Sequence, residues 1–400
     1  MTQQNREHGI LQLFTRQSAA GENSAELVVK GQGTVSALVA QAGQPFSITF
    51  MAASGTEPAL GLDIDRDVVR LWCRMDGTLR ILGQEKAANI GLNPTGEDQP
   101  YWLSLDSNNG RVRYGKGEML RELMLYEYSW PSDPNDNPLA FTKTLARVEV
   151  TPVPVAALQL LPIPVNLDPS PFVVPADAVT LESLSINASS VVADLPQACQ
   201  QLYATVAGRG MTLRPADFPD FPEAIQHSIL TPGCICYDEL AKKDPAFGYL
   251  RITIDGNLGD SPGQPYVLEV WPAGNGSPIH NHGRACAIIH VLYGSIDVSL
   301  FATLSPALTQ PWGKVSFTEG QVTFLTPDYY QIHQLQNPLP KGGRFCATIQ
   351  SYRYPDSDHV HYEYFDYIED GEIRHFTPDS DWTYLDFKRL IRAEWTAAHS

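Results

Sequence analysis

The sequence Trp-Pro-Ala-Gly-Asn-Gly-Ser-Pro-Ile-His-Asn-His-Gly, residues 271–283, decides the fold of the second half of the chain. It puts His280 and His282 two residues apart, just before the apolar, β-branched run 287–291. In an extended strand, residues i and i+2 point to the same face, so these two imidazoles can converge on one ion. Glycines precede the pair and Gly294 follows the run, so the predicted strand between them has an ordinary length. The stretch therefore predicts a β-strand that supplies two metal ligands.

Six candidate strands, separated by Gly, Pro, Asp or Asn, run through this half of the chain. They span residues 250–254, 266–271, 286–293, 296–303, 320–325 and 345–352. A second sequence block follows the histidine pair, with Gly320 at its start and His333 and Asn337 at its end. Two such blocks are the pattern of a cupin barrel, a small jelly roll that holds a metal in its mouth. His333 thus joins His280 and His282 as a predicted metal ligand.

The first half of the chain predicts an antiparallel β-sandwich over residues 25–150. Short alternating segments at 26–29, 47–51, 68–74, 79–82, 101–105 and 111–114 are separated by turn residues. Asp76-Gly77 and Asn109-Gly110 are hairpin-type turn pairs between such segments.

Residues 101–118, Tyr-Trp-Leu-Ser-Leu-Asp-Ser-Asn-Asn-Gly-Arg-Val-Arg-Tyr-Gly-Lys-Gly-Glu, resemble part of the β-domain named after farnesoic acid O-methyltransferase. The resemblance runs over roughly residues 25–130, with Val-Arg-Leu-Trp-Cys at 69–73 upstream. It implies a binding or packing module rather than methyl transfer, because the region has no glycine-rich loop for a methyl-donor nucleotide.

The remaining domain boundaries follow from composition. A polar segment covers 1–24, a proline-rich linker is predicted over 151–180, and the cupin domain with its preceding helices takes 181–400. Helical patterns at 181–207, with Pro196 at a helix start, and at 220–229 precede the barrel. The predicted fold class is mainly β, an N-terminal β-sandwich plus a C-terminal cupin (jelly-roll) barrel with a helical segment between.

Charge and cysteine content narrow the function classes. The 400 residues carry a net charge of −17, which argues against a nucleic-acid backbone or an anionic membrane surface as partner. The polar start, residues 1–8, has no signal-peptide core. Six cysteines are too few for a disulfide framework, so we expect a cytoplasmic, reducing location. The partner of the N-terminal domain is not predicted.

The kind of metal follows from the ligand types. Many cupins add a carboxylate three or four residues after the second histidine, but here Cys286 and Ala287 occupy those positions. Three neutral imidazoles leave open positions on an octahedral ion, which suits Fe(2+) with O2 and a sulfur ligand. Zinc with three histidines and a water is the competing interpretation.

Over roughly residues 247–355 the chain resembles the cysteine dioxygenase family, the thiol dioxygenases of the cupin superfamily. The matching segments are Tyr249-Leu-Arg251, Trp271-x8-His280-x-His282, His333-x3-Asn337 and Thr348-Ile-Gln350-Ser-Tyr352-x2-Pro355. The resemblance implies that Arg251 clamps a substrate carboxylate and that Tyr249 and Trp271 line the same pocket. It also implies that Tyr352 is the active-site phenol.

Two positions depart from the family pattern. In animal enzymes of the family, a cysteine forms a cross-link with the tyrosine. This chain has Ala287 at the position of that cysteine, and Cys286 lies one residue before it. Strict alternation from His282 would turn Cys286 inward, but it would also bury His290 inside the barrel. We therefore predict that Ala287 faces inward and that no cross-link forms. Gln350 replaces the family's histidine; it can hydrogen-bond the Tyr352 hydroxyl but cannot carry a proton charge.

The predicted function is an iron-dependent thiol dioxygenase that oxidises a small carboxylate-bearing thiol, cysteine or similar, to a sulfinic acid with O2. One alternative is a non-catalytic metal-binding cupin that acts as a binding protein. Another is a related oxygenase of another thiol or of a peptide's N-terminal cysteine. For single residues, Arg251 can instead be an ion-paired structural arginine, and Tyr249 and Trp271 packing aromatics. A second pair, His359-x-His361, has no third ligand in cupin order.

Overall fold

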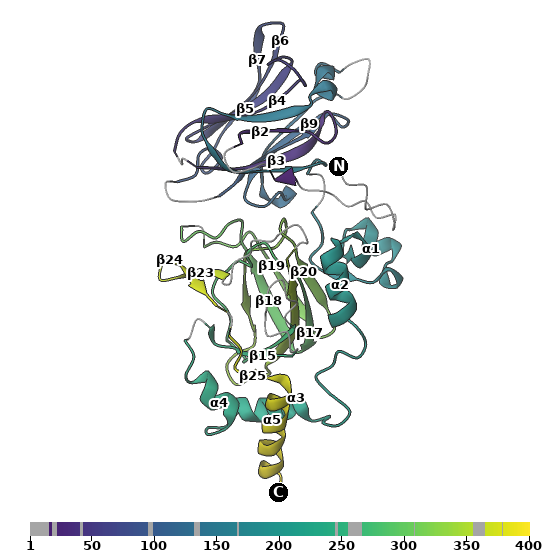
Figure 1. The fold of residues 1–400 in the computed structure, drawn as a ribbon, viewed down its shortest axis with the longest axis vertical. Coiled ribbons are helices and arrows are strands. Elements are labelled where there is room, and N and C mark those ends of the chain that lie inside the picture. The colour runs from purple at the N-terminus through teal and green to yellow at the C-terminus, as the bar shows by residue number, and fades with distance from the viewer. Residues whose placement is uncertain are drawn as a thin grey trace. The chain divides into compact units, whose positions relative to one another are not determined.

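The computed structural model describes residues 16–17, 22–40, 43–94, 99–131, 137–165, 168–244, 247–254, 266–307, 309–354, 365–377 and 379–400. The chain divides into two compact units, Met1–Asp168 and Pro169–Ser400. Figure 1 shows strands dominating both units and most of the helix in the second. Among the helices of the described residues, none has the length and apolar character needed to cross a membrane.

The N-terminal unit consists of two six-stranded antiparallel sheets (Figure 1). The first has the order β1 (Arg16–Gln17), β12 (Val155–Leu161), β3 (Gln32–Val39), β8 (Tyr101–Asp106), β9 (Arg111–Lys116) and β10 (Met124–Ser129). The second has the order β2 (Ser24–Glu26), β11 (Arg147–Thr151), β4 (Phe46–Met51), β5 (Ala59–Asp65), β6 (Val68–Met75) and β7 (Thr78–Lys86). Two 3-10 turns, η1 (Arg121–Leu123) and η2 (Ala140–Thr144), connect strands. One apolar core joins residues of both sheets, among them Val35, Leu62 and Leu105, so the predicted β-sandwich is confirmed.

The predicted linker 151–180 differs from the structure. Residues Val155–Leu161 form β12, which pairs with β3 and buries Leu158 and Leu160 in the sandwich core. Prolines flank this segment but do not interrupt it, so every amide within it can join the ladder. The boundary between the units lies at Asp168, later than the predicted end of the sandwich at residue 150.

The C-terminal unit contains an eight-stranded sheet, a three-stranded sheet and a hairpin. The order of the large sheet is β14 (Ser190–Val191), β13 (Val173–Val174), β20 (Val322–Leu325), β17 (Cys286–Tyr293), β22 (Cys346–Arg353), β16 (Tyr266–Trp271), β15 (Leu250–Thr253) and β25 (Trp382–Thr383). The small sheet has the order β19 (Gly313–Thr318), β18 (Ser295–Leu300) and β21 (His333–Gln336), and the hairpin is β23 (Phe365–Glu369) with β24 (Glu372–Phe376). Ile288 and Phe324 from the large sheet and Val298 and Phe317 from the small one belong to one core cluster. The two sheets therefore close on each other as the predicted jelly-roll barrel.

The helices described in this unit are α1 (Leu181–Ser185), α2 (Gln197–Val206), α3 (Phe221–Leu230), α4 (Ile235–Leu240) and α5 (Tyr384–Ala398), with the 3-10 turns η3 (Ala176–Ala178) and η4 (Val192–Asp194). Helix α2 packs on β17 and β22, whereas α4 and α5 pack on β15 and α3 packs on α4 and α5 (Figure 1). The predicted helix at 181–207 is interrupted, but α2 begins after Pro196 as expected. Because helices cover this face, alternate residues of β15 and β16 point the other way, into the barrel.

Candidate metal centre and pocket

The segment that carries the first two histidines runs beside β21, which carries the third. His280 and His333 exchange both backbone hydrogen bonds, at 3.0 and 3.1 Å. Ser277 donates its backbone N–H to the carbonyl of Leu335 at 2.9 Å. A Cβ on Gly276 would lie 2.4 Å from that carbonyl oxygen, so this close approach requires glycine. The glycine-rich sequence before the pair thus serves to bring the two histidine-bearing segments together.

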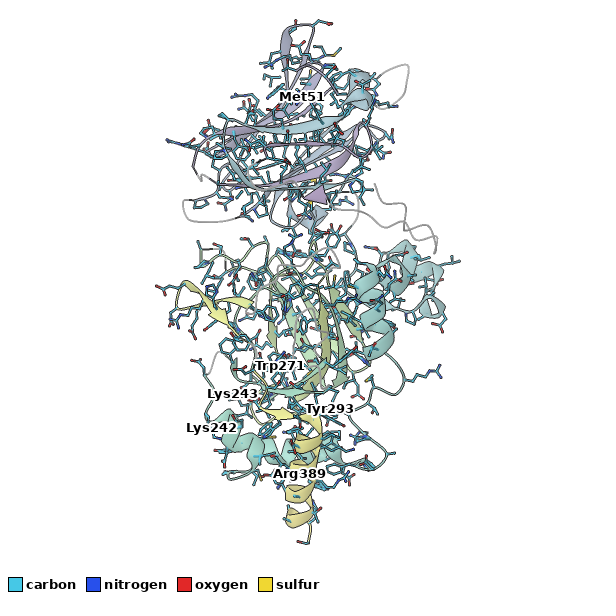
Figure 2. All side chains as sticks on the ribbon, in the orientation of Figure 1. Met51, Lys242, Lys243, Trp271, Tyr293 and Arg389 are labelled. Carbon is cyan, nitrogen blue, oxygen red and sulfur yellow. The ribbon has the colours of Figure 1, made fainter. Side chains whose placement is uncertain are left out.

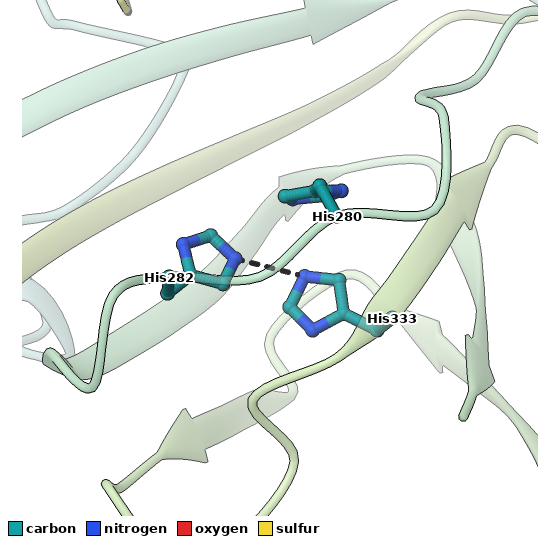
Figure 3. A group of neighbouring side chains, drawn as sticks. All are labelled: His280, His282 and His333. Carbon is teal, nitrogen blue, oxygen red and sulfur yellow. Dashed lines mark hydrogen bonds between the residues drawn. The ribbon is translucent and has the colours of Figure 1, made fainter. Parts of the chain in front are cut away.

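His280, His282 and His333 form one cluster (Figure 3). The three ring centroids are each 4.8 Å from the other two. One nitrogen from each ring lies within 4.8 Å of the others, and Nε2 of His282 is 3.1 Å from Nε2 of His333. Two nitrogens bound at about 2.1 Å to one ion lie roughly 3.0–3.4 Å apart for octahedral to tetrahedral angles. His282 and His333 therefore have the spacing of two ligands on one ion, and the third histidine has a nitrogen within 4.8 Å of both.

The other ring nitrogens define which atoms face the ion. Nδ1 of His280 lies 3.0 Å from the carbonyl of Pro278, and Nδ1 of His333 lies 3.1 Å from the carbonyl of Tyr330. Because a carbonyl only accepts, each Nδ1 carries the hydrogen and each Nε2 presents a lone pair. Nδ1 of His282 is buried and has no hydrogen-bond partner among the described residues. Lone pairs on facing buried nitrogens are satisfied by a cation, so the donor set fits a metal ion.

Burial favours the neutral form of all three rings. Desolvation lowers the pKa of His280, and it lowers that of His282 well below its usual value, with the other two histidines adding to the effect there. The same cause, with His280 second, lowers the pKa of His333 to about 3. Neutral imidazole is the form that binds metals, so no proton has to leave at neutral pH before an ion can bind.

The turn after His282 sets the register of the next strand. Gly283 and Arg284 have φ values of 55° and 66°, which break the strand alternation. As a result Ala287 pairs directly with Tyr352 and shares its face of the sheet. His290 points the opposite way and meets the carbonyl of Val206 on α2 at 2.9 Å.

Cys286 therefore faces α2 as well, where it interacts with Cys199. All six cysteines are free thiols. The prediction that Ala287 faces inward is confirmed, and the sulfur nearest in sequence points away from the Tyr352 ring.

A cavity of about 30 Å³ borders two of the three histidines on the side of β15 and β16. Its lining consists of Phe247, Tyr249, Arg251, Glu269, Trp271, Ser277, Pro278, His280, His282, Leu335, Gln350, Tyr352, Phe365, Tyr367 and Phe376. We call it the polar pocket, because it contains the Arg251 guanidinium and the Glu269 carboxylate. All five residues assigned to substrate or catalysis from the sequence line it, as do two of the three predicted ligands.

Arg251 and Glu269 oppose each other across neighbouring strands. They are register partners on β15 and β16, and Nε of Arg251 lies 3.8 Å from Oε1 of Glu269. Both side chains are about nine-tenths buried. Arg251 also donates from its guanidinium to the hydroxyl of Ser380 at 3.3 Å. The arginine is thus aimed into the pocket and is ion-paired there.

Gln350 links the phenol to this ion pair. The Tyr352 hydroxyl donates to the Gln350 carbonyl oxygen, and the Gln350 amide donates to Oε2 of Glu269 and, at 3.1 Å, to the hydroxyl of Thr348. The ring of Tyr352 stacks on His282 with centroids 5.3 Å apart. Gln350 therefore fixes the phenol beside a predicted ligand.

Sequence reasoning did not identify Glu269. Burial raises its pKa to about 7, against the lowering effect of Arg251, the Gln350 hydrogen bond and Lys243. A signal for it was present: one acidic residue interrupts the apolar strand Tyr-Val-Leu-Glu-Val-Trp, two residues before Trp271 and so on the same face.

Aromatic side chains form the walls of the polar pocket. Tyr249 stacks on Trp271 with centroids 4.2 Å apart, and Lys243 lies over the outer side of Tyr249 at 5.8 Å. Figure 2 shows Trp271 and Lys243 in the same region of the C-terminal unit. The indole N–H of Trp271 donates to Thr348 at 3.3 Å. These rings give the pocket stiff walls and exclude water from the ion pair.

The hairpin β23–β24 covers the histidine segment from the other side. The backbone N–H of Asn281 donates to the carbonyl of Asp366 at 2.9 Å, and Ile368 does the same to Ile279. Phe365 of the hairpin contacts the His282 ring with centroids 5.0 Å apart. The second histidine pair, His359 and His361, to which no site was assigned, and Pro355 lie outside the described residues.

A second cavity, also about 30 Å³, lies inside the barrel and borders His282 and His333. Its lining is Pro171, His282, Ile289, Val291, Ile296, Val298, Leu300, Val315, Phe317, Thr323, Phe324, Leu325, Tyr330, His333, Leu335, Thr348, Gln350 and Tyr352. None of these described lining residues is charged. We call it the apolar cavity; its volume holds about two water-sized molecules.

No family model matches the chain. Among solved structures it is similar to the Cnp3 cupin domain of Schizosaccharomyces pombe, at 12% identity and a TM-score of 0.21 over 29% of this chain and 67% of that one. A cupin 2 domain-containing protein from Halorhodospira halophila is similar at 16% identity and a TM-score of 0.22, over 40% and 86%. A recombinant oxalate oxidase in complex with glycolate is similar at 15% identity and 0.22, over 28% and 53%. With TM-scores near 0.2, these likenesses assign neither a family nor an activity to this chain.

Proposed function

We propose that the C-terminal unit is an iron-dependent thiol dioxygenase that oxidises a small carboxylate-bearing thiol to a sulfinic acid. The observation that carries the proposal is the polar pocket, in which two histidines of the three-histidine cluster, a buried guanidinium and a buried phenol face one small space. The reaction R–SH + O2 → R–SO2H balances without any further reductant, because one O2 accepts the four electrons that sulfur loses in two steps of the thiol oxidation ladder, through the sulfenic to the sulfinic level.

Three neutral imidazoles support Fe(2+) as the ion, since they leave positions open for other ligands and bring no carboxylate of their own. When bound, the iron supplies a place where a thiolate and O2 meet. His280, His282 and His333 would hold it through Nε2, with two of the rings fixed by backbone carbonyls.

The other residues bind and orient. Arg251 would pair with the substrate carboxylate, since a guanidinium forms a two-pronged hydrogen bond with it. Tyr352, held by Gln350 and stacked on His282, would position a hydroxyl beside the reacting sulfur. Tyr249 and Trp271 would form the wall against the substrate's carbon chain. The small volume of the polar pocket supports a substrate of few heavy atoms.

Oxygen uptake by iron-loaded, anaerobically purified protein tests the proposal. With cysteine, 3-mercaptopropionate and cysteamine as substrates, we expect one O2 consumed per sulfinic acid formed, as measured with an oxygen electrode and by mass spectrometry. Zinc-loaded protein is the matched control and should be inactive. If the iron-loaded protein consumes no O2 with any small thiol, the non-catalytic alternative replaces the proposal.

A further inference from the structure

We propose that Glu269 is a specificity residue that binds an ammonium group on the substrate, next to the carboxylate bound by Arg251. This rests on the proposed function, because it concerns the substrate of the same pocket. Among the described residues that line the polar pocket, Arg251 and Glu269 are the only Arg, Lys, Asp or Glu side chains. Among the described lining, this pair therefore supplies the charged side chains that a ligand meets there.

The spacing of the pair matches a zwitterion. Nε of Arg251 is 3.8 Å from Oε1 of Glu269, longer than a hydrogen bond. In an α-amino acid the nitrogen lies about 2.5 Å from the carboxyl carbon, as standard bond lengths and angles require. A ligand with both groups can therefore present its carboxylate to the guanidinium and its ammonium to the carboxylate at once.

Glu269 has the capacity to accept such a bond. Its Oε2 accepts from Gln350, while a carboxylate has about four lone-pair positions on its two oxygens. A buried ion pair with a purely structural role recovers its desolvation cost through short hydrogen bonds. The contact of Glu269 with Arg251, at 3.8 Å, is longer than that, so the carboxylate can also accept from an ammonium group of a ligand.

The backbone around Glu269 keeps the carboxylate in place. Glu269 is a register partner of both Arg251 on β15 and Thr348 on β22, so it lies on a central strand of the large sheet. Gln350, two residues from Thr348, ties the carboxylate to Tyr352. Glu269 therefore lies beside the arginine that would bind the substrate and also holds the glutamine that orients the phenol.

Glu269→Gln tests the role, because it removes the charge and keeps the shape. The matched control is Asp297→Asn on β18, which removes another buried carboxylate, one paired with Lys314 at 2.6 Å. We expect Glu269→Gln to lower kcat/KM for cysteine about ten- to a hundredfold, the usual effect of losing a charged hydrogen bond. For 3-mercaptopropionate, which has no ammonium, kcat/KM should fall far less, so the ratio of kcat/KM for the two substrates should change by about the same ten- to a hundredfold. Asp297→Asn should leave the ratio of the two substrates unchanged.

A binding measurement without turnover separates this inference from the proposed function. By calorimetry, the metal-loaded protein should bind serine more tightly than 3-hydroxypropionate or ethanolamine, and Glu269→Gln should abolish the preference for serine. An equal effect on all three ligands, or no preference in the wild type, overturns the role of Glu269. If no thiol is oxidised but the preference for serine is present and is lost in the variant, the dioxygenase proposal fails while Glu269 still recognises the ammonium group.

Discussion

Glu269→Gln should also change how the stability of the C-terminal unit depends on pH. Burial raises the pKa of Glu269 from 4.5 to about 7, and the side chain is only 8% exposed, so solvent screens it little. A difference of one pKa unit between the folded and the unfolded state is worth about 1.36 kcal/mol, so this difference changes the free energy of unfolding by about 3 kcal/mol.

The direction follows from which state holds the proton. Between pH 4.5 and 7 the folded protein keeps a proton on Glu269 that the unfolded chain has lost, so the stability of the wild type falls as the pH rises through this window. Glutamine does not titrate. The free energy of unfolding of the variant, relative to wild type, should therefore rise by about 3 kcal/mol from pH 4.5 to 7.5. Arg251 loses its counter-charge in the variant, but the guanidinium stays charged throughout and adds only a constant offset.

Denaturant unfolding at four pH values between 4.5 and 7.5 measures the effect, and Asp297→Asn serves as the control. The wild-type-minus-variant difference cancels contributions that both proteins share, such as those of the buried histidines. In thermal scans, about 3 kcal/mol corresponds to roughly 6–12 °C for a unit of this size. A difference that is flat across the window, or that slopes the other way, refutes the raised pKa and with it the dry environment assigned to Glu269.

Three further predictions concern the pocket and its surroundings. In steady-state kinetics, Arg251→Ala should raise KM about ten- to a hundredfold for carboxylate-bearing thiols and hardly change KM for cysteamine, and Arg251→Lys should restore little. Equal effects on both kinds of thiol would make the arginine structural. Intact-mass measurement should find no loss of two hydrogens, since Ala287 rather than Cys286 shares the face of Tyr352; a thioether peptide would show the register to be wrong. Val298→Phe, which fills the apolar cavity, should raise KM for O2 and leave the iron content unchanged, because O2 is a small apolar gas that favours an apolar cavity over water. An unchanged KM would mean that O2 reaches the site by another route.

The sequence predicted the metal-binding part of the fold because its signals are local. His280 and His282 are adjacent on one segment, and the third histidine follows a recognisable glycine and precedes Asn337, whose amide donates to the carbonyl of Trp271 at 2.9 Å. The inward position of Ala287 could also be predicted from the sequence, because the alternative register would have buried His290 in the barrel at a high cost. Such arguments need only a short stretch of sequence, although the prediction of one strand was wrong: His280 forms an isolated bridge, and β17 begins only at Cys286.

Features that depend on distant parts of the chain were missed. The strand β12 was interpreted as a linker because prolines flank it, although its pairing with β3 spans more than a hundred residues. Helix α5 and the hairpin β23–β24 were not predicted, and their positions follow from packing on β15 and on the histidine segment. The pairing of Arg251 with Glu269 needed the register of β15 and β16, which no single strand contains.

Metal content of histidine variants tests the central claim most directly. Wild-type protein purified without oxygen and loaded with Fe(2+) should hold about one iron per chain, since three histidines define one site. His280→Ala and His333→Ala should lose that iron and all thiol oxidation. His290→Gln, a buried histidine on the outer face of β17, should keep both. Full iron occupancy in the two alanine variants, or loss of iron in His290→Gln as well, would contradict the assignment of the metal to this cluster.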